Sequence, residues 1–332
     1  MRERLELLAG ARSGWEHFAE ETLELVGRGL GFDAAVIAPM DPETGLISGS
    51  VKRDLPDDSY PAFARYEYVT PAPGNFAELG RRSDPVAVLR EETAGDPRRN
   101  ARFDEFLAPQ LGIAHEVRVA GTADGRLVGG LSLFRSSSAQ GFDEDSAGLL
   151  RAIAPLLARG LRTAPARTAV SSPVRDHAVV LVDGDGRLEA SSEGARAWIA
   201  QLDPTGTRPV PVPIVTVVTA ARLHGSGELR VASASGWVRV RGTAVHRAGG
   251  APTTVVDIEP MRGLDAAQLT VSTIGLTRRE REVVELVLGG ASTAEIARRL
   301  QLSGYTVQDH LKAVFAKTGV RSRRELVASL LG

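Results

Sequence analysis

The sequence of 332 residues predicts an α+β fold that ends in an all-helical segment. Three observations predict it. Amphipathic helical stretches lie near the start and near the middle of the chain, short strand-like runs separate them, and residues 276–332 contain only helical periodicity and helix caps. Hydrophobic residues make up 43% and charged residues 24%, which is the balance of an ordinary folded protein.

The net charge of −1 conceals an uneven distribution along the chain. Residues 1–163 carry 19 basic and 25 acidic side chains, a net of −6, and residues 164–275 carry 11 and 10, a net of +1. Residues 276–332 carry 10 and 6, a net of +4. A basic end on an acidic body predicts an anionic partner for that end.

The sequence contains no Cys, which excludes disulfides, thiolate metal sites and a cysteine nucleophile. No apolar run reaches the roughly 18 residues needed to cross a bilayer. The start, Met-Arg-Glu-Arg, is unlike a signal peptide. We therefore expect a cytoplasmic protein without a membrane partner.

The first half of the chain alternates helices with strands. Apolar spacing predicts one long helix over 2–30 and a strand over 32–39. Further elements follow in order: a strand at 86–89, a helix at 98–111, a hairpin of 117–120 and 127–134, and a helix at 143–162. This order resembles a GAF-type sensor domain over residues 1–163.

Residues 164–173 predict a linker, and residues 263–275 a second connector. Between them the pattern predicts two strands, two helical segments and three strands, at 178–182, 187–190, 192–201, 214–223, 228–232, 237–244 and 253–259. This order resembles a PAS-type domain over residues 174–262.

Helix caps recur through the last segment of the chain. Thr277 with Glu280, Ser292 with Glu295, and Ser322 with Glu325 have the spacing of capping boxes. Only 301–303 separate the second of these helices from a third, predicted at 304–317 and capped by Ser303. Two helices joined by so short a turn predict a helix-turn-helix, whose second helix can enter the major groove.

Periodicity separates the buried face of that second helix from its free face. Val307, Leu311 and Val314 lie on one stripe, which we expect to pack on Ile296, Ala297 and Leu300. The opposite face carries candidate base-contacting residues, together with Ala316: Tyr305, Gln308, Asp309 and Lys312. Nearby polar and basic residues are candidate phosphate contacts: Thr293, Ser303, Thr306, His310, Lys317 and Arg321, with Arg323 and Arg324.

Spaced sequence blocks in this segment closely resemble the LuxR-type DNA-binding domain of bacterial transcriptional regulators. These blocks include Leu-Thr-Arg-Arg-Glu-Arg-Glu at 276–282, Thr-Ala-Glu-Ile-Ala at 293–297, Thr-Val-Gln-Asp-His-Leu at 306–311, and Lys-Thr-Gly-Val at 317–320. The resemblance covers residues 276–332. It implies a four-helix domain that binds double-stranded DNA as a homodimer, with the last helix at the dimer contact.

The acidic Asp309 departs from that family, where Asn is frequent at this place. Asp309 must either accept a hydrogen bond from a base or pair with Lys312. Tyr305 has two interpretations, a DNA contact or packing on Leu302, and His310 also has two, a structural role or a phosphate contact. Arg278, Arg279 and Arg281 are expected to pair with Glu282 and Glu285 at helical spacing.

The front half gives weaker functional signals. Five aromatic residues can line a sensor pocket, although core packing is the favoured interpretation: Trp15, Phe63, Tyr66, Tyr68 and Phe76. Asn100 is expected to cap a helix, and the pair Asp176 and His177 to lie at a strand edge. The helices at 2–30 and 143–162 are candidates for dimer contacts.

The sequence also limits the other function classes. A receiver domain needs a Lys after a late strand, and outside the last segment the chain has only Lys52. No phosphate-binding Gly-Lys loop, nucleophile elbow or metal-spaced His cluster is present, so we expect no enzyme, cofactor or metal. Nothing singles out His17, His115 or His246 as a haem ligand. For the N-terminal and middle domains the alternatives are a small-molecule signal, a protein signal or dimerisation alone, and a catalytic role is the least favoured of them.

Overall fold

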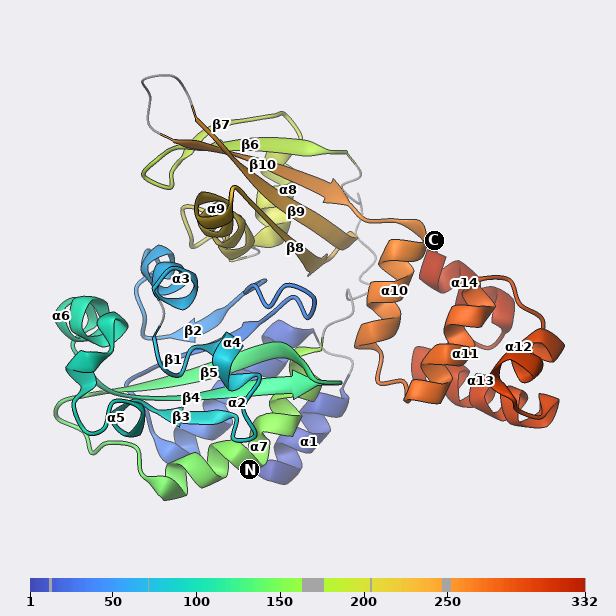
Figure 1. Ribbon diagram of the computed structural model, residues 1–332, viewed down its shortest axis with the longest axis horizontal. Coiled ribbons are helices and arrows are strands. Elements are labelled where there is room, and N and C mark those ends of the chain that lie inside the picture. Colours follow the sequence, from blue (N-terminus) through green and yellow to red (C-terminus); the bar gives the residue numbers. More distant parts are fainter. Residues whose placement is uncertain (12–13, 71, 163–175, 204, 247–251, 332) are drawn as a thin grey trace.

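The computed structural model describes residues 1–11, 14–70, 72–162, 176–203, 205–246 and 252–331. Three regions follow one another along the chain (Figure 1). The N-terminal region (1–162) and the middle region (176–260) are each built on an antiparallel sheet, and the C-terminal region (263–331) is helical. The α+β prediction is confirmed. Within the described residues, no helix combines the length and the apolar character needed to span a membrane.

The N-terminal sheet has five antiparallel strands in the order β2-β1-β5-β4-β3. Their bounds are β1 Ala34–Pro39, β2 Val51–Arg53, β3 Val86–Val88, β4 Ile113–Ala123 and β5 Arg126–Ser136. In the centre of the sheet, Ile37 pairs with Leu131, and Val119 pairs with Leu131 from the other side. Because side chains alternate along a strand, these residues point to one face and their neighbours to the other.

Three helices cover one face of this sheet: α1 Arg2–Gly10, α2 Trp15–Leu30 and α7 Glu144–Leu161. The prediction of one helix over 2–30 is wrong, because α1 ends at Gly10, the backbone is extended at Ala11, and a second helix begins at Trp15. Asp143 caps α7 by accepting a hydrogen bond from the Ser146 amide at 2.9 Å.

Shorter helices lie over the other face and beside the edge strand β3. They are α3 Tyr60–Tyr68, α4 Phe76–Leu79, α5 Leu89–Glu92, the 3₁₀ turn η1 Pro97–Arg99, the π turn η2 Phe103–Leu107 and α6 Ala108–Leu111. The helix predicted at 98–111 therefore starts later and contains a π turn. Asn100 caps it through a hydrogen bond from the Phe103 amide, as predicted.

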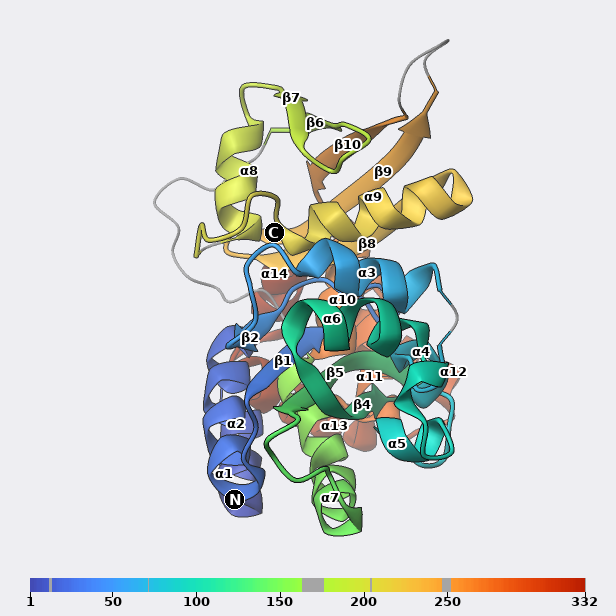
Figure 2. The same ribbon diagram turned by 90° about the vertical axis from the view of Figure 1, so that its left-hand side faces the viewer.

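The middle sheet repeats the strand arrangement of the N-terminal sheet, in the order β7-β6-β10-β9-β8. Its elements are β6 Ala178–Val182, β7 Leu188–Ser191, α8 Ala195–Leu202, α9 Val212–His224, β8 Ser226–Ser233, β9 Gly236–Val245 and β10 Thr253–Pro260. Helix α9 runs between this sheet and α3 (Figure 2). Gly242 permits the close approach, because a Cβ there would lie 2.7 Å from the carbonyl oxygen of Val217.

Five helices form the C-terminal region: α10 Gly263–Thr273, α11 Arg278–Leu288, α12 Thr293–Leu300, α13 Gly304–Thr318 and α14 Arg323–Leu331. The connector predicted at 263–275 is wrong, because most of it forms α10. This helix buries Ala267, Leu269 and Val271 and packs against α14 and α11. The linker predicted at 164–173 lies outside the described residues.

Candidate nucleic-acid interface

The predicted helix caps of the helix-turn-helix are confirmed. The Ser292 amide donates to Glu295 Oε2 at 2.6 Å and the Glu295 amide donates to Ser292 Oγ, which completes a capping box at the start of α12. Gln301 takes the left-handed conformation with φ 55° and turns the chain after α12. Ser303 then caps α13 by accepting a hydrogen bond from the Thr306 amide at 3.0 Å.

The buried stripe of α13 is also as predicted. Val307, Leu311 and Val314 are buried in one cluster with Ile296, and Ala297 and Leu300 pack at its edge. This apolar contact fixes the rotation of α13 relative to α12, so it determines which side chains of α13 face outward.

The free face of α13 is exposed over its whole length. Tyr305 is 78% exposed, an unusual exposure for a large aromatic side chain, and Gln308 and Ala316 are exposed beside it. Lys312 Nζ lies 3.3 Å from Asp309 Oδ1. In the chain without DNA, Asp309 therefore pairs with Lys312, which is one of its two predicted roles. The exposed Tyr305 side chain is accessible to a partner.

The residues predicted to contact phosphates lie around this face. Some of them form hydrogen bonds with one another or with Gln308. Gln308 Nε2 lies 3.4 Å from Thr293 Oγ1, and Ser303 Oγ lies 2.8 Å from Thr306 Oγ1. His310 is half-buried at the edge of the stripe. At the third predicted cap the Glu325 amide donates to Ser322 Oγ at 3.1 Å, but Glu325 Oε2 accepts from the Arg321 amide at 2.8 Å, so the capping box forms only in part.

Lys317 has a second role that the sequence did not indicate. Its Nζ lies 2.5 Å from Oε2 of Glu280, whose side chain is only 7% exposed. Burial alone would raise the pKa of Glu280, but the hydrogen bonds from Lys317 and from the Thr277 amide, with the charge of Lys317, lower it. The pair joins the end of α13 to the start of α11 and stabilises the arrangement of the helices.

Two of the predicted surface ion pairs form and the third is wrong. Arg278 and Arg279 both pair with Glu282, at 3.1 and 2.8 Å. Arg281 instead donates from Nη2 to Oδ2 of Asp124, at 2.9 Å, in the turn between β4 and β5 of the N-terminal region. The fold brings Asp124 within reach, so a contact between regions replaces a contact along the helix.

A second arginine strengthens this contact between the C-terminal and N-terminal regions. Arg162 Nη2 lies 3.6 Å from the same carboxylate oxygen of Asp124 and also donates to the Ser272 carbonyl at the end of α10. In the middle region, Trp237 Nε1 donates to Thr270 Oγ1 at 3.0 Å. The C-terminal region is thus anchored to both of the other regions.

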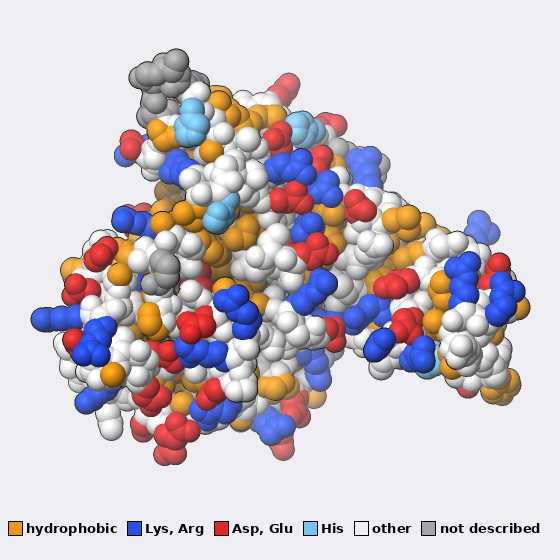
Figure 3. Space-filling model, in the orientation of Figure 1, with side chains coloured by type: hydrophobic (Ala, Val, Ile, Leu, Met, Phe, Trp, Pro, Cys, Tyr) orange, Lys and Arg blue, Asp and Glu red, His pale blue; other side chains and the backbone are white. Residues whose placement is uncertain are grey.

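Basic side chains gather at the outer end of the C-terminal region, on the right of Figure 3. This placement agrees with the net charge of +4 in residues 276–332. A surface of this kind attracts an anionic partner from solution.

The five aromatic residues that were candidates for a pocket fall into two groups, those that line a cavity and those that pack in hydrophobic clusters. Phe63 and Phe76 line a cavity in the N-terminal region. Trp15, Tyr66 and Tyr68 pack in or against hydrophobic clusters, as core packing predicts. His177, directly before β6, pairs with Asp257 of β10 at 3.1 Å, in agreement with a strand edge.

The charged side chains of this cavity were not predicted from the sequence. Glu67, Arg102, Glu116 and Arg118 are all buried there. One signal was present, because Glu116 and Arg118 alternate with valines in a strand-like run. The described residues contain no group of three or more His, Asp or Glu side chains arranged to hold a metal ion.

Comparison with known proteins identifies the C-terminal region. Residues 275–330 match the family described as bacterial regulatory proteins, luxR family. The monoamine regulon transcriptional regulator of Klebsiella aerogenes is 53% identical over 53 residues, which cover 16% of this chain and 23% of that protein. The chain therefore spans less than a quarter of the length of this relative.

A shorter relative is matched over most of its length. The spore germination protein GerE of Bacillus subtilis is 45% identical over 56 residues, which cover 17% of this chain and 76% of that protein. Among solved structures, a GAF domain of a phosphoenolpyruvate-protein phosphotransferase from Acinetobacter covers 48% of this chain and 89% of its own, with 14% identity and a TM-score of 0.34. On the match to its C-terminal helices, the chain belongs to the luxR family of bacterial regulatory proteins.

Proposed function

We propose that this protein regulates transcription by binding a specific DNA sequence through α13. The observation that carries the proposal is the exposed face of this helix, where Tyr305, Gln308, Asp309 and Lys312 project from a helix whose other side is buried. Gln can pair with adenine and Lys with guanine in the major groove, and a small residue such as Ala316 permits close approach. The phosphate contacts around it are Thr293, Ser303, Thr306, His310, Lys317 and Arg321.

The regulator acts as a homodimer in this proposal. Two recognition helices read half-sites about one helical turn of DNA apart. Helix α14, which the family resemblance places at the dimer contact, keeps Arg324, Glu325 and Ala328 exposed while Leu326 and Leu330 are buried inside the chain. Its outer face is therefore the surface we assign to the partner copy.

The N-terminal and middle regions, which we take as domains of 1–163 and 174–262, supply the control and not an enzymatic activity. A signal received there changes the position of the C-terminal region through the Asp124 and Trp237 contacts. In this proposal the protein acts in the cytoplasm, where the DNA is. In the alternative, the N-terminal and middle regions act only as protein-interaction or dimerisation modules. The cavity in the N-terminal region, which is lined by buried charged side chains, favours a small-molecule signal over this alternative.

Selection of bound sequences from a random DNA library tests the proposal with the full-length protein. We expect enrichment of an inverted repeat with half-sites about one helical turn apart, and a sedimentation coefficient on that DNA that corresponds to two protein copies. A library that stays unenriched at low salt would contradict the proposal. Enrichment of a single half-site would support sequence-specific DNA binding but would contradict binding as a dimer.

A further inference from the structure

A groove of about 410 Å³ lies where the N-terminal region meets the middle region, between α3 and α9. From α3 it is lined by Pro61, Arg65 and Val69, which lie four residues apart and therefore share one face of the helix. The lining residues of α9, from Val215 to Leu223, follow the same helical period. The groove is thus formed mainly by one face of each helix, and hydrophobic side chains are visible at this junction in Figure 3.

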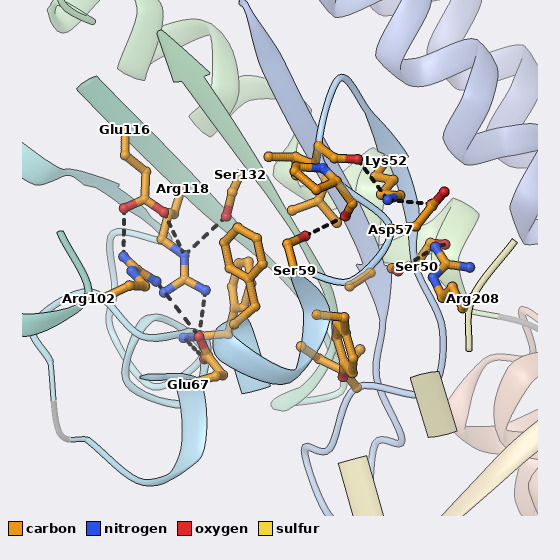
Figure 4. A pocket seen from close by; sticks show the side chains of 18 residues that line it. Ser50, Lys52, Asp57, Ser59, Glu67, Arg102, Glu116, Arg118, Ser132 and Arg208 are labelled. Carbon is orange, nitrogen blue, oxygen red and sulfur yellow. Dashed lines mark hydrogen bonds and ion pairs between the residues drawn. The ribbon is translucent and has the colours of Figure 1, made fainter. Parts of the chain in front are cut away.

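Helix α3 separates this groove from the cavity inside the N-terminal region, which Figure 4 shows. Other residues of α3 line that cavity, among them Tyr60, Phe63 and Glu67. The two hollows share no lining residue. The cavity has a volume of about 50 Å³, so the groove is by far the larger of the two.

The lining of the groove is mostly aliphatic, because valine, leucine and proline supply more than half of its residues. Val69 and Leu223 are 40% and 36% exposed, so the rim presents hydrocarbon to the solvent. Exposed apolar side chains bordered by polar ones are typical of ligand-binding grooves. An apolar cavity of about 150 Å³ accommodates benzene, so a groove of about 410 Å³ admits an occupant of roughly 15 non-hydrogen atoms.

Two arginines of the groove, Arg65 on α3 and Arg222 on α9, form no ion pair within the described part of the chain. Both side chains are exposed, and Arg222 donates to the carbonyl oxygen of Asp183, which carries no charge. The acidic residue of the lining, Asp185, is paired with Arg187 at 2.9 Å. The groove therefore has an excess of positive charge beside its aliphatic surface.

We propose that this groove binds an aliphatic molecule that ends in a single carboxylate, such as a medium-chain fatty acid. Arg65 and Arg222 hold the carboxylate, because a guanidinium pairs with carboxylate oxygens through strong N–H···O bonds. The hydrocarbon chain lies against the aliphatic face of α9. Two arginines repel an ammonium head group, and Asp185 in the same lining disfavours a phosphate monoester, which carries a charge of about −1.5 to −2.

A ligand in this groove contacts the N-terminal and middle regions at the same time. The Tyr60 hydroxyl, at the start of α3, already lies 2.6 Å from Thr216 Oγ1 in α9. A carboxylate shared by Arg65 and Arg222 adds a second link between the same two helices, so binding changes how firmly the regions are held together. The inference rests on the proposed function, because it assigns a chemical class to the signal that these regions receive.

Ligand-observed NMR on the full-length protein without DNA tests the proposal, with octanoate as the probe. Of the controls, 1-octanol keeps the chain without the charge, octylamine reverses the charge, and acetate keeps the carboxylate without the chain. We expect saturable octanoate binding with a Kd of about 0.1–1 mM, binding of 1-octanol at least fivefold weaker, and no binding of octylamine or acetate. Octylamine that binds as tightly as octanoate, or octyl phosphate that binds more tightly, would overturn the proposal.

Two variants at exposed positions separate the role of the charge from the role of the aliphatic lining. Arg65→Gln removes a positive charge, and we expect it to weaken octanoate binding about fivefold and to leave 1-octanol binding unchanged. Val69→Trp fills the groove and should weaken the binding of both probes. Arg196→Gln makes the matched change at an exposed arginine of α8 outside the groove and should alter neither. Octanoate binding that is the same in all three variants would overturn the site.

The results for the groove and for the proposed function can be told apart. We expect saturating octanoate to change the affinity for the selected DNA, and an unchanged affinity would overturn its role as the signal. Absence of saturable octanoate binding by a protein that still selects its DNA would overturn the groove assignment alone. Loss of DNA selection with intact octanoate binding would instead overturn the proposed function.

Discussion

Lys312 and Asp309 form an ion pair on the exposed face of α13, with 3.3 Å between Nζ and Oδ1. The two side chains are 72% and 57% exposed, and a pair this open contributes little to stability. The interaction is therefore easily exchanged for contacts with bases. It also cancels one positive charge on the surface that we assign to DNA.

Removal of either of two candidate base-reading side chains should relax sequence preference. We expect Lys312→Ala and Gln308→Ala each to lose about 1–3 kcal/mol at the selected site and much less on unrelated DNA, because a base contact is lost. Fluorescence anisotropy on the selected site and on single-base substitutions measures this. Arg4→Ala, which removes a positive charge from α1, serves as control. Unchanged affinity in both variants would refute the recognition surface.

Asp309→Asn should tighten binding to all sequences. The substitution removes a negative charge and frees Lys312, so we expect non-specific affinity to rise and the dependence on salt to steepen by up to about one unit. Affinity on random duplexes across a salt series measures both. A weaker non-specific affinity would show that Asp309 accepts a hydrogen bond from DNA itself.

Lys317 and Glu280 should link the stability of the C-terminal region to pH. The pKa of Glu280 is lowered in the folded protein, so its contribution is present above the ordinary value of 4.5 and is lost as pH falls through the folded-state value. We expect Lys317→Ala to lose about 1–3 kcal/mol of unfolding free energy at neutral pH, since a buried carboxylate loses its partner. Urea unfolding at several pH values measures this, with Glu280→Gln as the variant in which the dependence is absent.

The same lysine provides a test of phosphate contact. If Lys317 exchanges Glu280 for a phosphate in the complex, Lys317→Ala should weaken binding to every sequence and lower the salt slope by about one unit. The measurement is a salt titration on the selected site and on random DNA. An unchanged slope would restrict Lys317 to its structural role.

Asp124 should control the position of the DNA-reading helices with little effect on stability. Its partners Arg281 and Arg162 belong to α11 and to the end of the N-terminal region. We expect Asp124→Asn to change the unfolding free energy by less than about 1 kcal/mol, because the carboxylate is half exposed. Small-angle scattering should show a larger radius of gyration. An identical scattering curve would mean that Trp237 and α10 hold the region by themselves.

Gly130→Ala should destabilise the N-terminal region. A Cβ at Gly130 would lie 2.2 Å from the Phe76 ring, which is buried against Arg118. We expect a loss of about 1–3 kcal/mol from overpacking, measured by thermal unfolding. Gly125→Ala, at a turn with open space and φ of 74°, is a useful comparison, because it introduces backbone strain without displacing the ring.

Features that depend on residues close together in the sequence were largely predicted. Contacts between residues far apart in the sequence were not. The caps at Thr277, Ser292 and Ser303 and the stripe through Val307 depend on residues a few positions apart, so their spacing was informative. The partner of Arg281 lies 157 residues away, and the cavity joins residues of β1, α3 and β4. Helix α10 was missed because its contacts with α14, α11 and β9 arise from tertiary packing, which its own short sequence does not indicate.

Helix α10 contacts the middle sheet through Thr270 and packs along α14. An 11-residue helix is a stiff rod of roughly 16 Å, whereas a coil of that length would let the C-terminal region rotate freely. Operators should therefore tolerate little variation in the number of base pairs between half-sites. A regulator with this geometry would bind weakly to sites that contain both half-site sequences at a spacing that differs by a few base pairs.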